Sequence, residues 1–188
     1  LPTSVQLKEF TSKVTQYRDL PEELVSILKA LPKHTRPMDV LQMAVSSLGT
    51  FYDLEVSPEK VKGKKYDEKY FLNTSAALIG ALGSIVAAWH RIRNGDEPIS
   101  SKPDCTYAEN FLHILGAEKI TPLMTRIMDA TLVLHGEHTI NASTFTAMVT
   151  SSTLANASQV VASAIGSLSG PLHGGANEKV IAMLQKIE

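Results

Sequence analysis

The amino-acid sequence predicts an all-α fold, and three observations support this. Apolar residues recur at spacings of three and four, the period of an amphipathic helix. Alternating runs that indicate strands are nearly absent, and the five Phe, five Tyr and one Trp are scattered. With 188 residues, 44% of them hydrophobic, the chain is expected to bury one core.

Three helices are predicted before residue 50. The first begins at an N-cap formed by Thr3 or Ser4, whose hydroxyls accept from free backbone amides. The second starts after Pro21, because the fixed φ of proline suits a helix start. The third runs from Pro37 to a stop at Gly49.

A polar loop and a long helix follow. Residues 50–65 carry four lysines, which we interpret as a solvated surface in preference to an anion site (Lys60, Lys62, Lys64 and Lys65). Small and apolar residues from 67 to 94 predict one core helix, with His90 in its last turn near the negative end of the helix dipole.

The second half of the chain predicts further helices. One begins near Asp104, and another is entered through Thr121 and Pro122. The run 139–170 is rich in Ala, Ser and Thr and poor in charge. Since such surfaces are costly to leave in water, this segment is either the centre of the domain or an interface with another subunit. We expect a helix pair over 142–169 that packs against its counterpart in a second subunit.

Charge and cysteine content exclude several classes. The net charge of −1 gives no electrostatic footprint for nucleic acid or an anionic membrane. The single cysteine, Cys105, favours a reducing compartment, and we assign it no chemistry. The first residues resemble no targeting signal, and the apolar stretches fall short of a membrane span, so a cytoplasmic location is expected.

Two histidines stand at breaks before predicted helices. His173 lies between Gly170-Pro171 and Gly174-Gly175, where glycine permits close approach and positive φ and proline fixes the chain direction. His138 is followed by Asn141, Ser143 and Thr144 at a helix start, where amides suit a small carboxylate or carbonyl ligand. We expect the two imidazoles to line one cleft.

Other chemistry is disfavoured. His135 and His138 share a helical face, but no third ligand at a suitable spacing completes a metal set, so no metal site is predicted. There is no G-x-S-x-G elbow, phosphate loop or dinucleotide fingerprint. Neutral imidazoles that donate to a carbonyl suit enolisation, with a carboxylate elsewhere removing the α proton.

The chain resembles the citrate synthase family through two ordered stretches, LHGEHTINASTF at 134–145 and GPLHGGANE at 170–178. The similarity extends upstream through 20–49, 85–95 and 107–116, and so covers essentially the whole chain. It implies the condensation of oxaloacetate with acetyl-CoA, giving citrate and CoA, in a mostly helical homodimer. Acetyl-CoA is a substrate, and no other cofactor is implied.

The resemblance also implies residue roles. In the family, the histidine matching His173 is catalytic and donates a hydrogen bond to the thioester carbonyl. The one matching His138 binds oxaloacetate, and Asn141 matches an asparagine that supports the pair at the substrate. Ser143 matches a serine that contacts the thioester histidine.

Several family features are missing. A third histidine in a G-[FY]-G-H segment, a catalytic aspartate and further arginines have no match before Glu188, and a family stretch should precede Leu1. Arg36 replaces a usual histidine, and Gly83-Ser84 stands where Pro-Thr is common. Residues 1–188 are therefore expected to be an interior part of the large helical domain, inactive alone, without the small domain and the C-terminal part.

Two alternatives stay open. The motifs do not report the length of the acyl chain, so a 2-methylcitrate synthase using propionyl-CoA is the nearest. A non-catalytic helical dimerisation piece is the other, because the expected base and arginines have no match.

Overall fold

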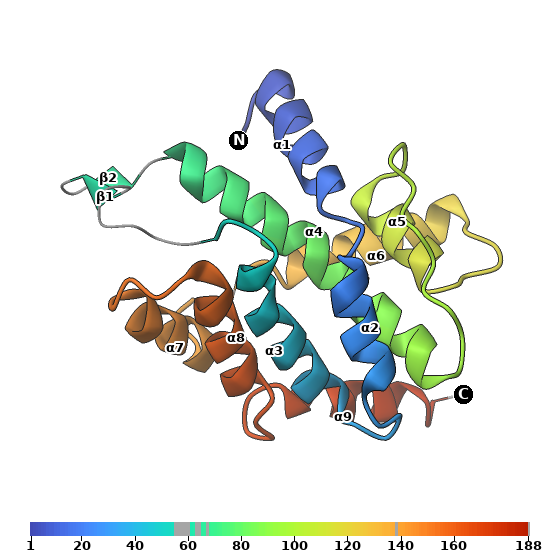
Figure 1. Ribbon diagram of the computed structural model, residues 1–188. Helices are drawn as coiled ribbons and strands as arrows, with labels where there is room; N and C mark the ends of the chain where they lie inside the picture. Colours follow the sequence, from blue (N-terminus) through green and yellow to red (C-terminus); the bar gives the residue numbers. More distant parts are fainter. Residues whose placement is uncertain (55–60, 63–64, 67, 138, 188) are drawn as a thin grey trace.

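The computed structural model describes residues 1–54, 61–62, 65–66, 68–137 and 139–187 (Figure 1). It confirms the all-α prediction. The helices are α1 (Ser4–Gln16), α2 (Glu22–Ala30), α3 (Pro37–Ser47), the 3₁₀ turn η1 (Leu48–Thr50), α4 (Glu68–Arg93), α5 (Tyr107–Ile114), α6 (Pro122–Leu134), α7 (Ala142–Ser151), α8 (Ala157–Leu168) and α9 (Gly175–Leu184). Within these described ranges, the one strand pair is the two-residue antiparallel ladder of β1 (Val61–Lys62) and β2 (Lys65–Tyr66).

Several helix starts follow their predicted caps. The Thr3 side chain accepts from the backbone of Gln6, whose own side chain accepts from Thr3 in return, which forms a capping box. By contrast, α5 begins at Tyr107, three residues after the predicted start, because Thr106 and not Asp104 caps it through the Glu109 amide at 3.2 Å.

Gly49 was predicted to end the third helix, but the structure gives a different reason for glycine at this position. The chain continues from α3 through η1, and Gly49 lies inside this 3₁₀ turn. A Cβ there would lie 2.5 Å from the Asn156 side chain and 2.8 Å from Ser158 Oγ. Glycine is therefore required because α8 begins against this turn. Of the lysine cluster, Lys60 and Lys64 lie outside the described residues.

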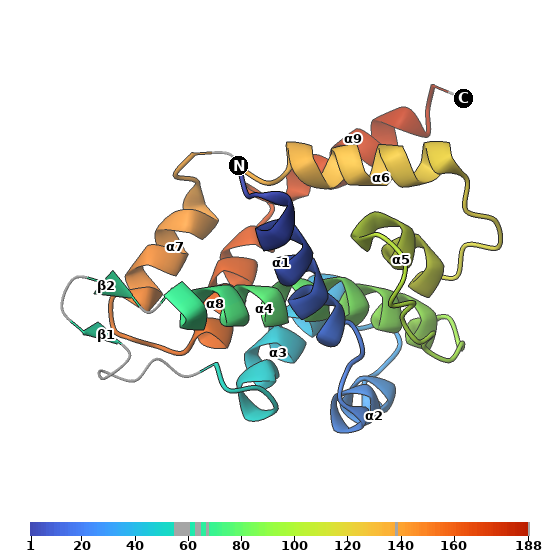
Figure 2. The same ribbon diagram turned by 90° about the horizontal axis from the view of Figure 1, so that it is seen from above.

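The core is arranged around α4, which α1, α2, α3 and α5 all contact (Figures 1 and 2). Its buried face is mostly small, and a Cβ on Gly80 would lie 2.6 Å from the Val14 carbonyl of α1. Larger side chains from α4 and its neighbours complete the core, among them Leu24, Leu28, Val40, Val45, Ile85 and Trp89.

Helix α4 also corrects the expectation that every apolar stretch is too short for a membrane span. It has 26 residues and an 18-residue window of mean hydropathy 1.7, which matches a span by length and composition. However, 56% of that window is buried inside the fold, as is usual for a core helix.

The run 142–169 forms the expected helix pair, α7 and α8, but only α8 enters the core. Helix α8 packs on α3 and buries Ser158, Ala162 and Ile165. Helix α7 packs on α8 and buries none of its own residues. The pair therefore joins the site-bearing end of the chain to the core through α3.

Candidate functional site

The structure brings Ser143 and His173 together. Ser143 lies in the first turn of α7, and its Oγ is 2.8 Å from Nε2 of His173. The same hydroxyl is 3.0 Å from the Ala164 carbonyl of α8, to which it also can donate. Packing of α7 on α8 therefore carries the serine to a histidine that follows it by 30 residues.

The imidazole is held by a tight turn between α8 and α9. The Gly174 amide donates to the Leu168 carbonyl at 3.0 Å and to the Gly170 carbonyl at 3.2 Å, and the His173 amide donates to Gly170 at 3.0 Å. A Cβ on Gly174 would lie 2.2 Å from the Leu168 oxygen. Glycine is thus needed at 174 for close approach.

The expectation that the glycines beside His173 adopt positive φ is wrong. Among the described glycines, only Gly95 and Gly116 have positive φ, and the three that flank His173 do not. The turn is a continuation of helical geometry, with φ −76° and ψ −15° at Gly174. The position of the His173 ring therefore does not depend on positive φ at these glycines.

Asn141 is the N-cap of α7. Its Oδ1 accepts from the Thr144 amide at 2.9 Å, so this oxygen is committed to the helix. Its Nδ2 donates to no residue in the described part of the chain, which leaves an amide donor for a ligand oxygen. His138 lies outside the described residues, so its predicted place beside Asn141 stays a prediction.

No metal centre forms within the ranges the structure describes. His135 is exposed at the end of α6, and its Nδ1 lies 2.7 Å from the Thr131 carbonyl of the same helix. It therefore fits an ordinary helix end better than a ligand. Cys105 also remains without a role, because burial and Glu109 raise the pKa of its thiol and so disfavour the nucleophilic thiolate.

A hollow of about 580 Å³ lies beside the His173 turn. Arg36 and Met38 line it from the start of α3, and Lys179 lines it from α9, together with residues of the turn itself. Its two cations favour an anionic ligand. Neither cation was predicted from the sequence as a lining residue, although Arg36 replaces a histidine that is usual in the family.

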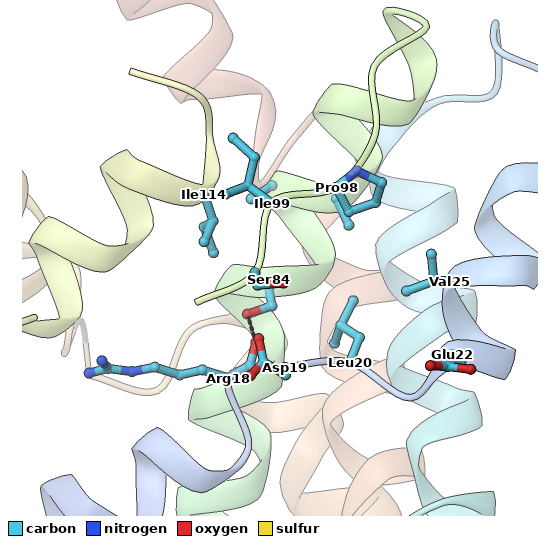
Figure 3. Close-up of a pocket in the computed structure, with 12 residues that line it drawn as sticks. Arg18, Asp19, Leu20, Glu22, Val25, Ser84, Pro98, Ile99 and Ile114 are labelled. Atoms are coloured by element: carbon cyan, nitrogen blue, oxygen red, sulfur yellow. Dashed lines mark hydrogen bonds between the residues drawn. The ribbon is translucent and has the colours of Figure 1, made fainter. Parts of the chain in front are cut away.

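A second hollow, of about 240 Å³, lies elsewhere in the fold (Figure 3). It is lined by the link between α1 and α2, by α4 and by Pro98 to Ser100, and shares no residue with the first. The Arg18 side chain points away from it, and Nη1 donates to the Cys105 carbonyl at 3.0 Å. Burial lowers the pKa of this guanidinium, which here ties a loop to the core.

Comparisons with known proteins agree on one family. The family model described as "Citrate synthase, C-terminal domain" matches residues 1–188. The citrate synthase of Acidithiobacillus ferridurans is 41% identical over 187 residues, which are 100% of this chain and 48% of that protein. A 2-methylcitrate synthase of Shewanella oneidensis is 36% identical over 189 residues, with the same coverage.

A solved structure shows the same fold. The crystal structure of citrate synthase from Pyrobaculum aerophilum superimposes with a TM-score of 0.87 at 32% identity, covering 100% of this chain and 47% of that one. The chain therefore spans about half the length of the relatives it matches.

The turn geometry predicts different tolerance at two adjacent glycines. Gly174→Ala should destabilise the fold by about 1–3 kcal/mol, because the Leu168 backbone must move to admit the methyl group. Gly175→Ala should be neutral or stabilising, since its nearest neighbour would be Pro171 Cβ at 4.0 Å and alanine favours a helix. Urea unfolding of both variants checks this, and equal stabilities would contradict the close packing at 174.

Proposed function

Because this chain belongs to the citrate synthase family, we propose that the protein containing it condenses oxaloacetate with acetyl-CoA to give citrate and CoA. The observation that carries the proposal is the contact between Ser143 Oγ and His173 Nε2, formed inside the two stretches that resemble the family. Both substrates are anions, which suits the cationic hollow beside the turn.

The hydroxyl of Ser143 selects the tautomer of His173 in this proposal. A neutral imidazole carries one proton, so only one of its nitrogens donates. When Ser143 donates to Nε2, the proton lies on Nδ1, which then donates to the thioester carbonyl oxygen. When Ser143 donates to the Ala164 carbonyl instead, the imidazole proton lies on Nε2 and points to Ser143 Oγ. Nδ1 then has no proton to donate to the thioester. Only the first arrangement supports enolisation.

The chemistry follows from that donor. As a base removes the α proton of the acetyl group, negative charge develops on the thioester oxygen and the hydrogen bond from Nδ1 strengthens. The enol carbon then attacks the ketone carbon of oxaloacetate, and water cleaves the thioester to release CoA. We assign Asn141 Nδ2 and His138 to oxaloacetate, and the base to a carboxylate outside these 188 residues.

His173→Ala should lower kcat by roughly 10²–10³-fold while oxaloacetate affinity changes little, because the lost bond strengthens only as charge develops. Ser143→Ala should lower kcat by about tenfold, the value of one neutral hydrogen bond. Steady-state kinetics on the full-length protein measures both effects.

The matched control is Ser151→Ala, whose hydroxyl donates only to the Met148 carbonyl of its own helix. It should behave like wild type. Thermal melts identify any unfolding. Near-normal kcat in a folded His173→Ala enzyme would contradict this mechanism. A full-length wild type without condensation activity would favour the alternative that this chain is a non-catalytic dimerisation piece.

Because some relatives are named 2-methylcitrate synthase, condensation with propionyl-CoA is the second candidate activity. We expect acetyl-CoA to be preferred over propionyl-CoA by at least about tenfold in kcat/KM, since one methylene in a fitted pocket changes the ratio by about that much or more. Release of CoA from each thioester by the full-length protein gives the ratio. A preference for propionyl-CoA would reassign the protein to the second activity.

We also propose a homodimer that uses the outer face of α7. Phe145, Met148 and Val149 are 61%, 54% and 55% exposed there, and α6 likewise buries none of its residues. Since exposed apolar patches mark interfaces, a second copy is the expected partner. Because α8 buries residues in the core, we limit the interface predicted over 142–169 to α7.

Light scattering should give the mass of two chains, and Phe145→Asp with Met148→Asp should give one. Phe71→Asp is the control, since Phe71 is also exposed, at 63%, but lies on a different helix, α4. A wild-type monomer at high concentration would refute the dimer. The cytoplasmic location, the assignment of residues 1–188 to a large domain and the inactivity of this chain alone stay predictions.

A further inference from the structure

The turn that links α6 to α7 contains an unusual backbone conformation. Thr139 has φ +55°, in the left-handed region. β-Branched residues rarely adopt it, because the side chain crowds the neighbouring carbonyl. Leu154 is the one other non-glycine residue with positive φ in the described part of the chain. Something in the structure must therefore hold Thr139 in this state.

Hydrogen bonds on both sides of Thr139 supply that restraint. Oε1 of Glu137 accepts a hydrogen bond from the Thr139 amide. The Thr139 carbonyl accepts from the Asn141 amide at 3.2 Å and from Thr144 Oγ1 at 3.5 Å. The chain of bonds runs from the Glu137 carboxylate to the first turn of α7.

That first turn carries two residues assigned to the site. Asn141 caps it through Oδ1, which leaves Nδ2 for a ligand, and Ser143 reaches His173. Helix α7 buries no residue of its own, so its start depends on these polar contacts and on α8. The conformation of Thr139 therefore affects where both side chains lie.

We propose that Glu137 is a positioning residue, whose carboxylate holds Thr139 in the left-handed turn and thereby fixes Asn141 for oxaloacetate. The proposal rests on the proposed function. Without the carboxylate, Thr139 relaxes toward negative φ, and the population of the competent turn falls by about tenfold, as the cost of a left-handed residue implies. Apparent affinity falls by the same factor.

The test separates binding from chemistry in the full-length protein. Glu137→Ala should raise KM for oxaloacetate by about tenfold and leave kcat within about twofold, since saturating substrate selects the competent turn. Glu137→Gln retains a side-chain oxygen acceptor and should stay close to wild type. Asp129→Ala, which removes an exposed carboxylate from α6, is the control and should change neither constant.

A second substitution tests the turn itself. Adding Thr139→Gly to Glu137→Ala should restore most of the lost affinity, because glycine adopts positive φ without steric cost. An unchanged KM in Glu137→Ala would overturn the proposal. The proposal would also be overturned if Glu137→Gln raised KM as much as Glu137→Ala and Thr139→Gly restored neither. That result would assign the effect to the charge of Glu137.

Amide hydrogen exchange gives a readout that does not need activity. The Thr139 amide should exchange about tenfold faster in Glu137→Ala than in wild type and at the wild-type rate in Glu137→Gln. If wild type fails to form citrate but exchange changes in this way, the proposed function fails and the turn restraint stands. Equal exchange rates in wild type and Glu137→Ala would overturn the restraint, whatever the activity.

Discussion

The close approach of neighbouring helices to α4 is the constraint on which the rest of the structure depends. Ala77, Ala81 and Ala88 place small side chains on the buried surface of α4, and Gly80 lets the α1 backbone lie directly against it. Helix α3 also packs on α4, and α8 packs on α3. The turn that carries His173 follows α8, so the position of the imidazole is set, two helices away, by small residues in α4.

Local rules predicted much of this fold because they act over a few residues. Thr3 and Pro37 mark helix starts through capping and fixed φ, and the structure has both. Gly49 shows the limit of such rules. Its sequence context indicates a helix stop, whereas its real constraint is contact with Asn156, more than a hundred residues later. A clash between distant segments leaves no local pattern in the sequence.

The candidate site, like the fold, was predicted from the sequence only in part. The order of the two histidine stretches identified the family and drew attention to Ser143 and His173, but their contact depends on how α7 packs on α8. Arg36 and Lys179 meet at one hollow from opposite ends of the chain, so charge patterning did not reveal them. The left-handed turn at Thr139 was also missed, since threonine signals no positive φ.

Helix α7 differs from its neighbours in what holds it. It buries no side chain, and its links to the rest of the chain include Ser143 to Ala164 and Thr150 to Ser163, at 3.0 and 2.9 Å. Elements with few buried apolar contacts open at lower free energy than the core. In a single copy of this chain, α7 should therefore separate on warming while α3, α4 and α8 are still folded. In the proposed dimer, a second copy bound to α7 would raise the free energy of that opening, so its stability would depend on protein concentration.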